Sequence, residues 1–294
     1  MFSGIESLKE EIKTFLKIKK VNIPSENPYF SVTKNKIVCE KEINKKKISY
    51  SYEFSKIFSE YYDYFNIYHE VARNCIKDSI NENNYTFISY GETNSEKHDL
   101  LFSDYNCKNK GIFPRLCKDL FNKKEVFSIS LMFVYDNKLF DINDIIKNIH
   151  NENYENKNSY EYIQQIMDYG LEIKQNSDII ENIIKIKIFD LNQFYNLLNK
   201  YNSFFNILQK ENVTEYSIKS NKEEIKYPFI FSSSYFIYVI YLYDKNKKNE
   251  IISKISFIEF ASNDNLITKI NNKKLSSSVT NCLLNFSFNI FPFL

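Results

Sequence analysis

Alternating apolar and polar residues predict short, half-buried strands near the start of the chain. Thr14 to Asn22 (TFLKIKKVN) alternates apolar with basic side chains, and Ile37 to Cys39 and Ile48 to Phe54 repeat the pattern more weakly. A period of two is typical of a strand with one buried face. We therefore expect strands in these segments.

A helix and a strand are predicted next. Apolar residues recur at helical spacing from Tyr61 to Ile80, and the polar stretch Asn81 to Asn84 follows. Tyr85 to Tyr90 (YTFISY) is dense in aromatic and β-branched residues, as short strands are. Gly91 comes directly after it, so this is where a phosphate-binding loop would lie.

The remaining pattern predicts further elements on both sides of a polar insertion. Before the insertion we predict a helix over Phe113 to Phe121 and a central strand, buried on both faces, over Val126 to Tyr135. The insertion itself, Asn151 to Tyr160, should be a loop. After it we predict a strand pair at Leu171 to Lys174 and Ile183 to Phe189, a helix over Leu191 to Leu198 with Asp190 as its N-cap, a hairpin of Phe236 to Tyr243 with Ile252 to Phe260, and a helix over Leu266 to Phe286.

Composition is that of a globular chain with a large core. Hydrophobic residues make up 43% of the 294 residues, which suits one large α/β domain. The formal net charge of +2 gives no field that would favour nucleic acid or an anionic membrane. Serines interrupt the most apolar stretch, Pro228 to Tyr243, and it is shorter than the roughly 20 residues of a membrane span, so we expect a buried strand and no membrane insertion.

Cysteine and N-terminal patterns favour a cytosolic location. The five cysteines form no CxxC pair, which indicates reduced thiols and neither a disulfide framework nor a zinc site. Met1 to Lys20 has no uninterrupted apolar core, so it does not look like a secretory signal. Only four glycines occur, although loops that hold phosphates depend on glycine for close backbone approach.

Eight segments, among them the one that contains the glycine-led loop, stand in a recognisable order along the chain. They are Leu16 to Asn22 (LKIKKVN), Tyr52 to Phe58 (YEFSKIF) with Ile67 to Ala72 (IYHEVA), Tyr85 to Lys97 (YTFISYGETNSEK), Gly111 to Phe121 (GIFPRLCKDLF), Ser130 to Ile142 (SLMFVYDNKLFDI), Ile255 to Asp264 (ISFIEFASND) and Asn272 to Leu284 (NKKLSSSVTNCLL). Together they resemble the motifs of kinesin motor domains, where the loop itself reads GQTGSGKT. The resemblance thins between residues 143 and 231.

This resemblance implies a fold and a set of partners. The fold would be the P-loop NTPase-like kinesin motor fold, an α/β architecture with a central, mostly parallel mixed sheet flanked by helices on both faces. One such domain would span residues 1–294, with insertions within 143–231. The family's ligands are ATP or ADP with Mg²⁺, and its partners are microtubules and other kinesin chains, in the cytoplasmic cytoskeleton. Asn289 to Leu294 stands where the family continues with PYRxSKLT, and the family's remaining tubulin-binding helices and neck linker lie beyond that point, so we expect either that the chain is a fragment or that this surface is incomplete.

The same resemblance assigns a nucleotide-binding loop to eight residues. They are Gly91, Glu92, Thr93, Asn94, Ser95, Glu96, Lys97 and His98. Lys97 matches the lysine that reaches the β- and γ-phosphates. Glu96 replaces a glycine, which would bring a carboxylate toward phosphate, and His98 replaces the Thr or Ser whose hydroxyl binds Mg²⁺. Asn94 replaces another glycine, a milder change because Asn tolerates left-handed backbone.

The two sensor motifs of the family are also altered. Glu259 and Ser262 stand for the Asp and Gly of DLAGSE, and Asp264 for its acidic end. Ser232, Ser233 and Ser234 stand for SSRSH, whose arginine is missing, since the only arginines are Arg73 and Arg115 in other motifs. Phosphoryl transfer depends on positioning and electrostatics, so these losses together predict weak or no hydrolysis and no confident catalytic or metal-binding residue.

Three functional classes remain open from the sequence. The first is an active microtubule motor, the second a non-hydrolysing scaffold that binds tubulin or another kinesin, and the third a regulatory domain that binds nucleotide through Lys97. A catalytic role for His98 is conceivable, but a lone loop histidine is more often structural.

Overall fold

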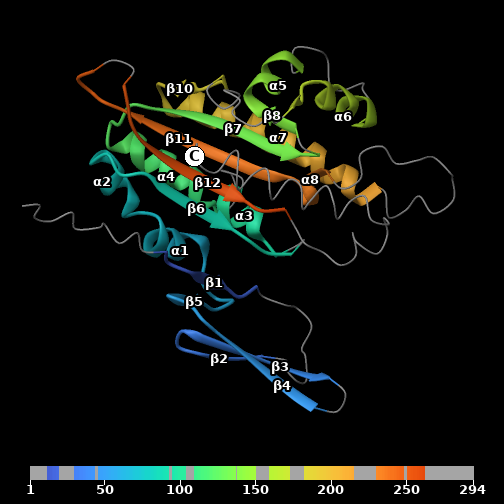
Figure 1. Cartoon of the computed structure of the whole chain (residues 1–294). Helices are drawn as coiled ribbons and strands as arrows, with labels where there is room; N and C mark the ends of the chain where they lie inside the picture. Colours follow the sequence, from blue (N-terminus) through green and yellow to red (C-terminus); the bar gives the residue numbers. More distant parts are fainter. Residues whose placement is uncertain are drawn as a thin grey trace, which may run out of the picture. The chain divides into compact units, whose positions relative to one another are not determined.

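The computed structural model describes ten stretches of the chain, residues 12–19, 30–43, 46–92, 95–103, 109–136, 138–149, 159–172, 182–214, 230–247 and 250–261. These residues fall into two compact units, divided between Asp63 and Tyr64 (Figure 1).

The first unit contains two small sheets. One is the parallel pair β1 (Phe15–Lys17) and β5 (Lys56–Phe58), and the other is the antiparallel meander β2 (Phe30–Thr33), β3 (Lys36–Ile43) and β4 (Lys46–Glu53). The two-residue turn between β2 and β3 is closed by Thr33 Oγ1, which donates to Lys36 O at 3.3 Å. The strands expected at Ile37 to Cys39 and Ile48 to Phe54 are confirmed. Of Thr14 to Asn22, only β1 is a strand, and residues 20–22 lie outside the described stretches.

The second unit is a larger sheet with its helices. Its elements are α1 (Tyr64–Val71), α2 (Cys75–Ile80), β6 (Tyr85–Ser89), α3 (Lys97–Phe102), α4 (Ile112–Asn122), β7 (Phe127–Tyr135), β8 (Lys138–Asp141), α5 (Ile142–Ile149), α6 (Ser159–Asp168), β9 (Leu171–Glu172), β10 (Ile186–Ile188), α7 (Leu191–Thr214), α8 (Ile230–Ser233), β11 (Tyr235–Tyr243) and β12 (Ile251–Glu259). In Figure 1, α7 runs along the sheet behind β7 and β11.

The large sheet is mixed, as expected, but antiparallel pairs outnumber parallel ones. Its strand order is β6-β12-β11-β7-β8-β9, with β10 also paired to β7. Among the described strands of this sheet only β6 and β12 run parallel. The expected balance toward parallel pairs is therefore wrong, because short connections join β7 to β8 and β11 to β12, and short connections can only join antiparallel neighbours.

Several predicted elements of the second unit are confirmed. The apolar run at Val126 to Tyr135 forms β7, in which every residue is buried, and the hairpin is β11 with β12. Asp190 caps α7, since its Oδ1 accepts from the backbone N–H of Gln193 at 2.8 Å. The helix and strand expected at Phe113 to Phe121 and Tyr85 to Tyr90 are α4 and β6.

Three predictions differ from the structure or fall outside it. The helix expected over Tyr61 to Ile80 is two helices, because Arg73 N donates to Tyr68 O, five residues back, and leaves the helical register. The expected strand pair does not form, since β9 pairs with β8 and β10 with β7. Of the loop predicted over 151–160, residues 151–158 lie outside the described stretches and residues 159 and 160 belong to α6. The helix expected over 266–286 also lies outside the described stretches.

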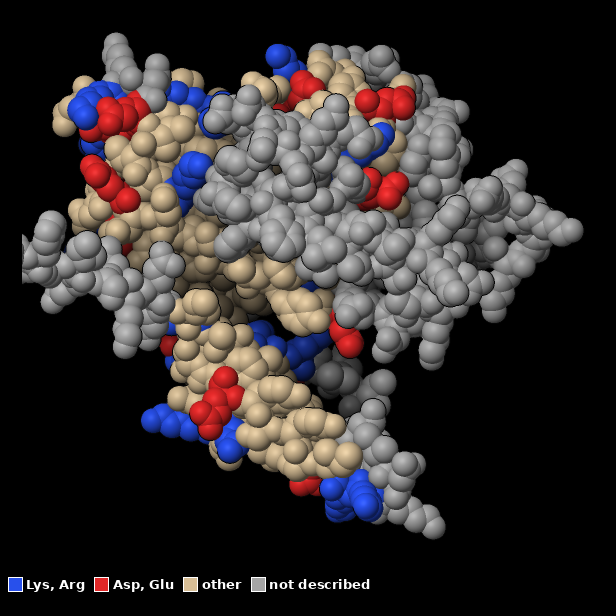
Figure 2. Space-filling view, viewed as in Figure 1, with Lys and Arg blue, Asp and Glu red and all other residues tan. Residues whose placement is uncertain are grey.

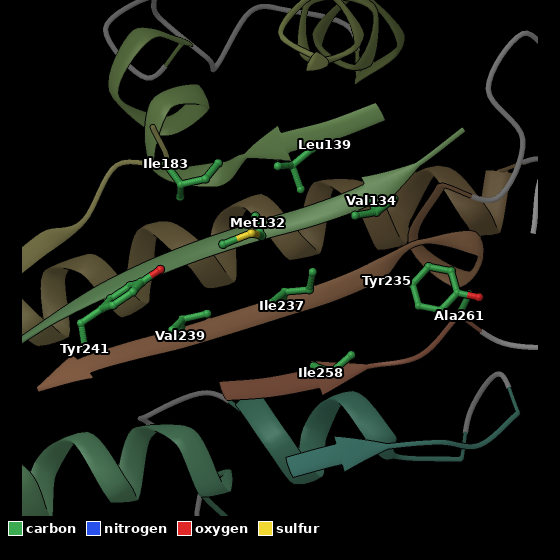
Figure 3. Close-up of a cluster of buried hydrophobic side chains, with 10 residues drawn as sticks. All are labelled: Met132, Val134, Leu139, Ile183, Tyr235, Ile237, Val239, Tyr241, Ile258 and Ala261. Carbon is green, nitrogen blue, oxygen red and sulfur yellow. The ribbon is translucent and has the colours of Figure 1, made fainter. Parts of the chain in front are cut away.

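The core of the second unit lies on both faces of the large sheet. Figure 3 shows one face, where a cluster of buried side chains comes from Met132, Val134, Leu139, Ile183, Tyr235, Ile237, Val239, Tyr241, Ile258 and Ala261. On the other face, Phe236 and Tyr238 of β11 meet aromatic rings from α3, α4 and α7. This second, aromatic face is where the candidate site lies.

Basic and acidic side chains do not form separate patches on the surface drawn in Figure 2. The Lys and Arg residues of the described stretches are interspersed there with Asp and Glu, in keeping with 39 basic and 37 acidic residues in the whole chain. On that face, the described residues therefore produce no extended field of one sign.

Candidate functional site

The glycine-led loop connects β6 to α3, as predicted from its strand and glycine signals. Of its residues, Thr93 and Asn94 lie outside the described stretches. Gly91 sits close to the far side of the loop, since a Cβ added to it would lie 2.4 Å from Ser95 Oγ. Ser95 N donates to Glu92 O at 3.2 Å, which closes a turn just before α3.

Glu96 has a left-handed backbone at the start of α3, with φ 66° and ψ 15°. Its carbonyl accepts from Leu100 N at 2.9 Å, the first turn of the helix. Its carboxylate accepts from the Tyr64 hydroxyl at 3.3 Å. Burial, followed by the nearby charge of Glu96, raises the pKa of Tyr64 well above its ordinary value, so this phenol stays protonated and can donate.

Lys97 bonds to its own loop. Its Nζ donates to Gly91 O at 2.8 Å, and Ser89 Oγ donates to Lys97 O at 3.4 Å. The amine that would reach phosphates is thus held at the base of the loop by a backbone carbonyl.

His98 and Glu259 are in direct contact. His98 Nδ1 lies 2.8 Å from Glu259 Oε2, and the side chains are 13% and 2% exposed. With the carboxylate ionised, the imidazole Nδ1 is the donor. The Tyr238 hydroxyl lies 3.4 Å from both atoms, and burial raises its pKa well above the ordinary value, with the charge of Glu259 as a second cause. The three groups form one largely buried hydrogen-bonded set.

Aromatic rings surround the imidazole of His98. The nearest ring centroids belong to Phe205 at 4.7 Å and Phe231 at 5.1 Å, with Phe102 and Phe236 near 6 Å. These rings come from α7, α8, α3 and β11. Their apolar surfaces leave little space around the imidazole for solvent.

The chain's sequence matches the model of the kinesin motor domain over residues 8–285. The chain belongs to the kinesin motor domain family. It is also 27% identical over 125 residues to the Kinesin-1 heavy chains of Homo sapiens, Rattus norvegicus and Mus musculus. This match covers 38% of the chain and 13% of each of those relatives, so the chain matches only a small part of their length.

Two positions from different kinesin motifs lie in contact in the structure. His98 stands where the family loop has Thr or Ser, and Glu259 where the sensor DLAGSE has Asp; the fold brings these two positions together across 161 residues. The other two residues expected at that sensor, Ser262 and Asp264, lie outside the described stretches.

The serines expected at the other kinesin sensor lie in and after α8, beside the same aromatic cluster. Ser232, Ser233 and Ser234 are all buried. The Ser234 hydroxyl donates to Ile230 O, and Ser233 Oγ has no hydrogen-bond partner among the described residues.

Both arginines of the chain make contacts close to their own positions in the sequence or across to α1. Arg73 Nη1 lies 3.0 Å from His69 Nδ1, four residues earlier on the chain. Arg115 Nε donates to Lys110 O at 3.0 Å, and its guanidinium lies 5.2 Å from the Phe65 ring centroid. Both guanidiniums are held in helix and loop contacts of their own.

Sequence reasoning did not find Tyr238, Phe205 or Phe231. Each belongs to an apolar run that indicates core packing, and nothing in such a run marks one ring as a neighbour of His98. Only the packing of β11, α7 and α8 places them.

None of the described helices combines the length and the apolar character that a membrane-spanning helix needs.

Proposed function

We propose that this chain is a kinesin-like protein that associates with microtubules and hydrolyses ATP slowly or not at all. Its membership of the kinesin motor domain family supports a motor-like protein. We further propose that residues 1–294 act as one motor domain in the cytoplasmic cytoskeleton, with both compact units belonging to it.

The contact between His98 and Glu259 carries the proposal of weak hydrolysis. Mg²⁺ prefers oxygen ligands in octahedral geometry, whereas His98 offers a ring nitrogen. At 2.8 Å from that nitrogen, the Glu259 oxygen is already engaged. Nor does any group of three or more His, Cys, Asp or Glu in the described stretches suit a metal ion. These residues do not fit a magnesium ion, so we derive no reaction step through it.

The loop supports the same proposal from the phosphate side. The Glu96 carboxylate would repel a phosphate, and the Lys97 amine would have to leave Gly91 O to reach one. Loss of a single positioned contact to a reacting group often costs about 10²–10³ in rate. Here both the hydroxyl that binds Mg²⁺, at position 98, and the loop glycine, at position 96, are replaced, which should reduce turnover further.

A non-hydrolysing scaffold is the second candidate. Binding tubulin or another kinesin chain requires only the folded surface, and the hydrogen bonds among His98, Glu259 and Tyr238 are compatible with a fold that is stable without nucleotide. Nucleotide binding through Lys97 without hydrolysis lies between the two candidates.

The first test is phosphate release by the purified chain with and without microtubules. We expect a rate below about one-hundredth of that of a Kinesin-1 motor domain assayed in parallel, because of the lost contacts. Microtubule co-sedimentation in the same buffer should recover the chain in the pellet. Release stimulated by microtubules to a Kinesin-1-like rate would refute weak hydrolysis, and absence from the pellet would refute microtubule association.

A further inference from the structure

Glu259 is a carboxylate with 2% exposure on the central strand β12, and it needs compensation there. An uncompensated buried charge is among the most costly features of a folded protein. Within the described stretches, the hydrogen-bond partners of its carboxylate are His98 Nδ1 at 2.8 Å and the Tyr238 hydroxyl at 3.4 Å. The shorter of these bonds reaches from α3 to β12.

The surroundings make that bond strong and persistent. Phe205 and Phe231 place their rings edge-on to the imidazole, with interplanar angles of 73° and 78°. A hydrogen bond in such a largely apolar place is electrostatically stronger than one at the surface, and Glu259, at 2% exposure, has little water to replace it. Breaking it would leave a buried carboxylate with only the long bond from Tyr238.

We propose that the His98–Glu259 hydrogen bond is a permanent internal tie that holds α3 against β12 in one arrangement, with or without nucleotide. The inference deepens the proposed function, on which it rests, because the tie lies where a metal-bound nucleotide would otherwise join these elements. The occupants of the site are then protein groups, and the conformation of α3 does not respond to nucleotide.

Amide hydrogen exchange of the intact chain tests the tie directly. We expect the amides of α3 and of Phe257 to Glu259 to exchange at the same rates, within about twofold, alone and with MgADP or MgATP, because the tie is already made. Slowing of α3 exchange by more than about tenfold on adding either nucleotide would overturn the proposal.

Substitutions test which residue provides the tie. His98→Ala should accelerate exchange in α3 at least about tenfold and lower the midpoint of thermal unfolding by about 10 °C, since it leaves Glu259 unpaired. His98→Gln, which keeps a donor, should retain much of the protection. His69→Ala is the matched control, because this histidine of α1 contacts Arg73, four residues further along the chain, and the substitution should leave α3 unchanged.

A double-mutant cycle separates pairing from simple loss of packing. Glu259→Gln removes the charge that His98 compensates, so His98→Ala should lower the unfolding midpoint much less in that background. Equal effects of His98→Ala in both backgrounds would overturn the tie. Such a failure is distinct from failure of the proposed function, which would appear as phosphate release by the unmodified chain.

Discussion

Glu96 is one of four residues other than glycine that have a positive φ in the described stretches. Its φ of 66° lies in the left-handed region, which side-chain-bearing L-residues enter at a cost of roughly 1–2 kcal/mol. The kinesin motif has glycine at this position, and glycine takes such a conformation freely. The hydrogen bond that the Tyr64 hydroxyl donates to the Glu96 carboxylate, at 3.3 Å, offsets part of this cost.

Replacing Glu96 by glycine should therefore stabilise the fold. We expect Glu96→Gly to raise the free energy of unfolding by about 0.5 kcal/mol, since relief of the backbone outweighs the lost contact and the entropy of glycine. Urea denaturation would measure it. Glu92→Gly is the control, because Glu92 does not have a positive φ. This substitution should lower stability slightly. A fall in stability for Glu96→Gly as large as for Glu92→Gly would contradict this account.

At the scale of elements, α7 is the helix that closes the aromatic face. Tyr201, Phe204, Phe205 and Leu208 recur at spacings of three and four and are all buried, so one stripe of α7 faces the sheet. Phe205 reaches furthest into the site, with ring contacts to His98, Phe102 and Phe236.

Truncating Phe205 should undock this helix face. We expect Phe205→Ala to lower the free energy of unfolding by about 3–5 kcal/mol, because it leaves a cavity among close-packed rings. Phe189→Ala just before α7 is the control, since Phe189 is 70% exposed and should cost under about 1 kcal/mol. Chemical denaturation measures both, and similar losses for the two variants would show that α7 does not seal the site.

At the scale of the whole molecule, a buried polar network joins segments that are distant in sequence. Asp141 accepts from the backbone N–H of Ile184 at 2.7 Å and of Asn143 at 2.9 Å. The Asn143 amide donates to Ile129 O and Ile184 O, and Tyr201 donates to Asn143. The network thereby connects β7, β8, α5, α7 and the segment before β10.

This network makes global stability depend on pH. Burial raises the pKa of Asp141 to about 6, despite the backbone donors that favour its ionised form. A raised pKa means that the folded state binds the proton more tightly than the unfolded state does. Protonated Asp141 therefore adds to the free energy of unfolding below about pH 4, and this stabilisation is lost as the pH rises through about 6.

Asp141→Asn should remove that dependence. Relative to the parent, the variant should be least stable at pH 4 and gain about 2 kcal/mol by pH 7, because only the parent bears a buried negative charge there. Urea titrations at pH 4, 5, 6 and 7 would measure the difference. Asp168→Asn, at an exposed site on α6, should keep a constant difference across these pH values. A constant difference for Asp141→Asn as well would contradict the effect.

Patterns within short segments were enough to predict most local elements and the family. The apolar run of β7, the β11–β12 hairpin and the cap at Asp190 could be predicted because each depends on neighbouring residues. The ordered motifs gave the resemblance that the family match from residue 8 to residue 285 confirms. The two altered positions, His98 and Glu259, were found as separate substitutions.

Which of these residues meet could not be predicted without the folded arrangement of the strands and helices. It paired β9 and β10 with different strands, divided the expected helix before Ala72, and placed His98 against Glu259 with Tyr238 beside both. Periodicity reports which side of an element is buried, but not what lies opposite that side. The partner is chosen by packing between segments far apart in the chain, and the energy of a buried hydrogen bond depends on that partner.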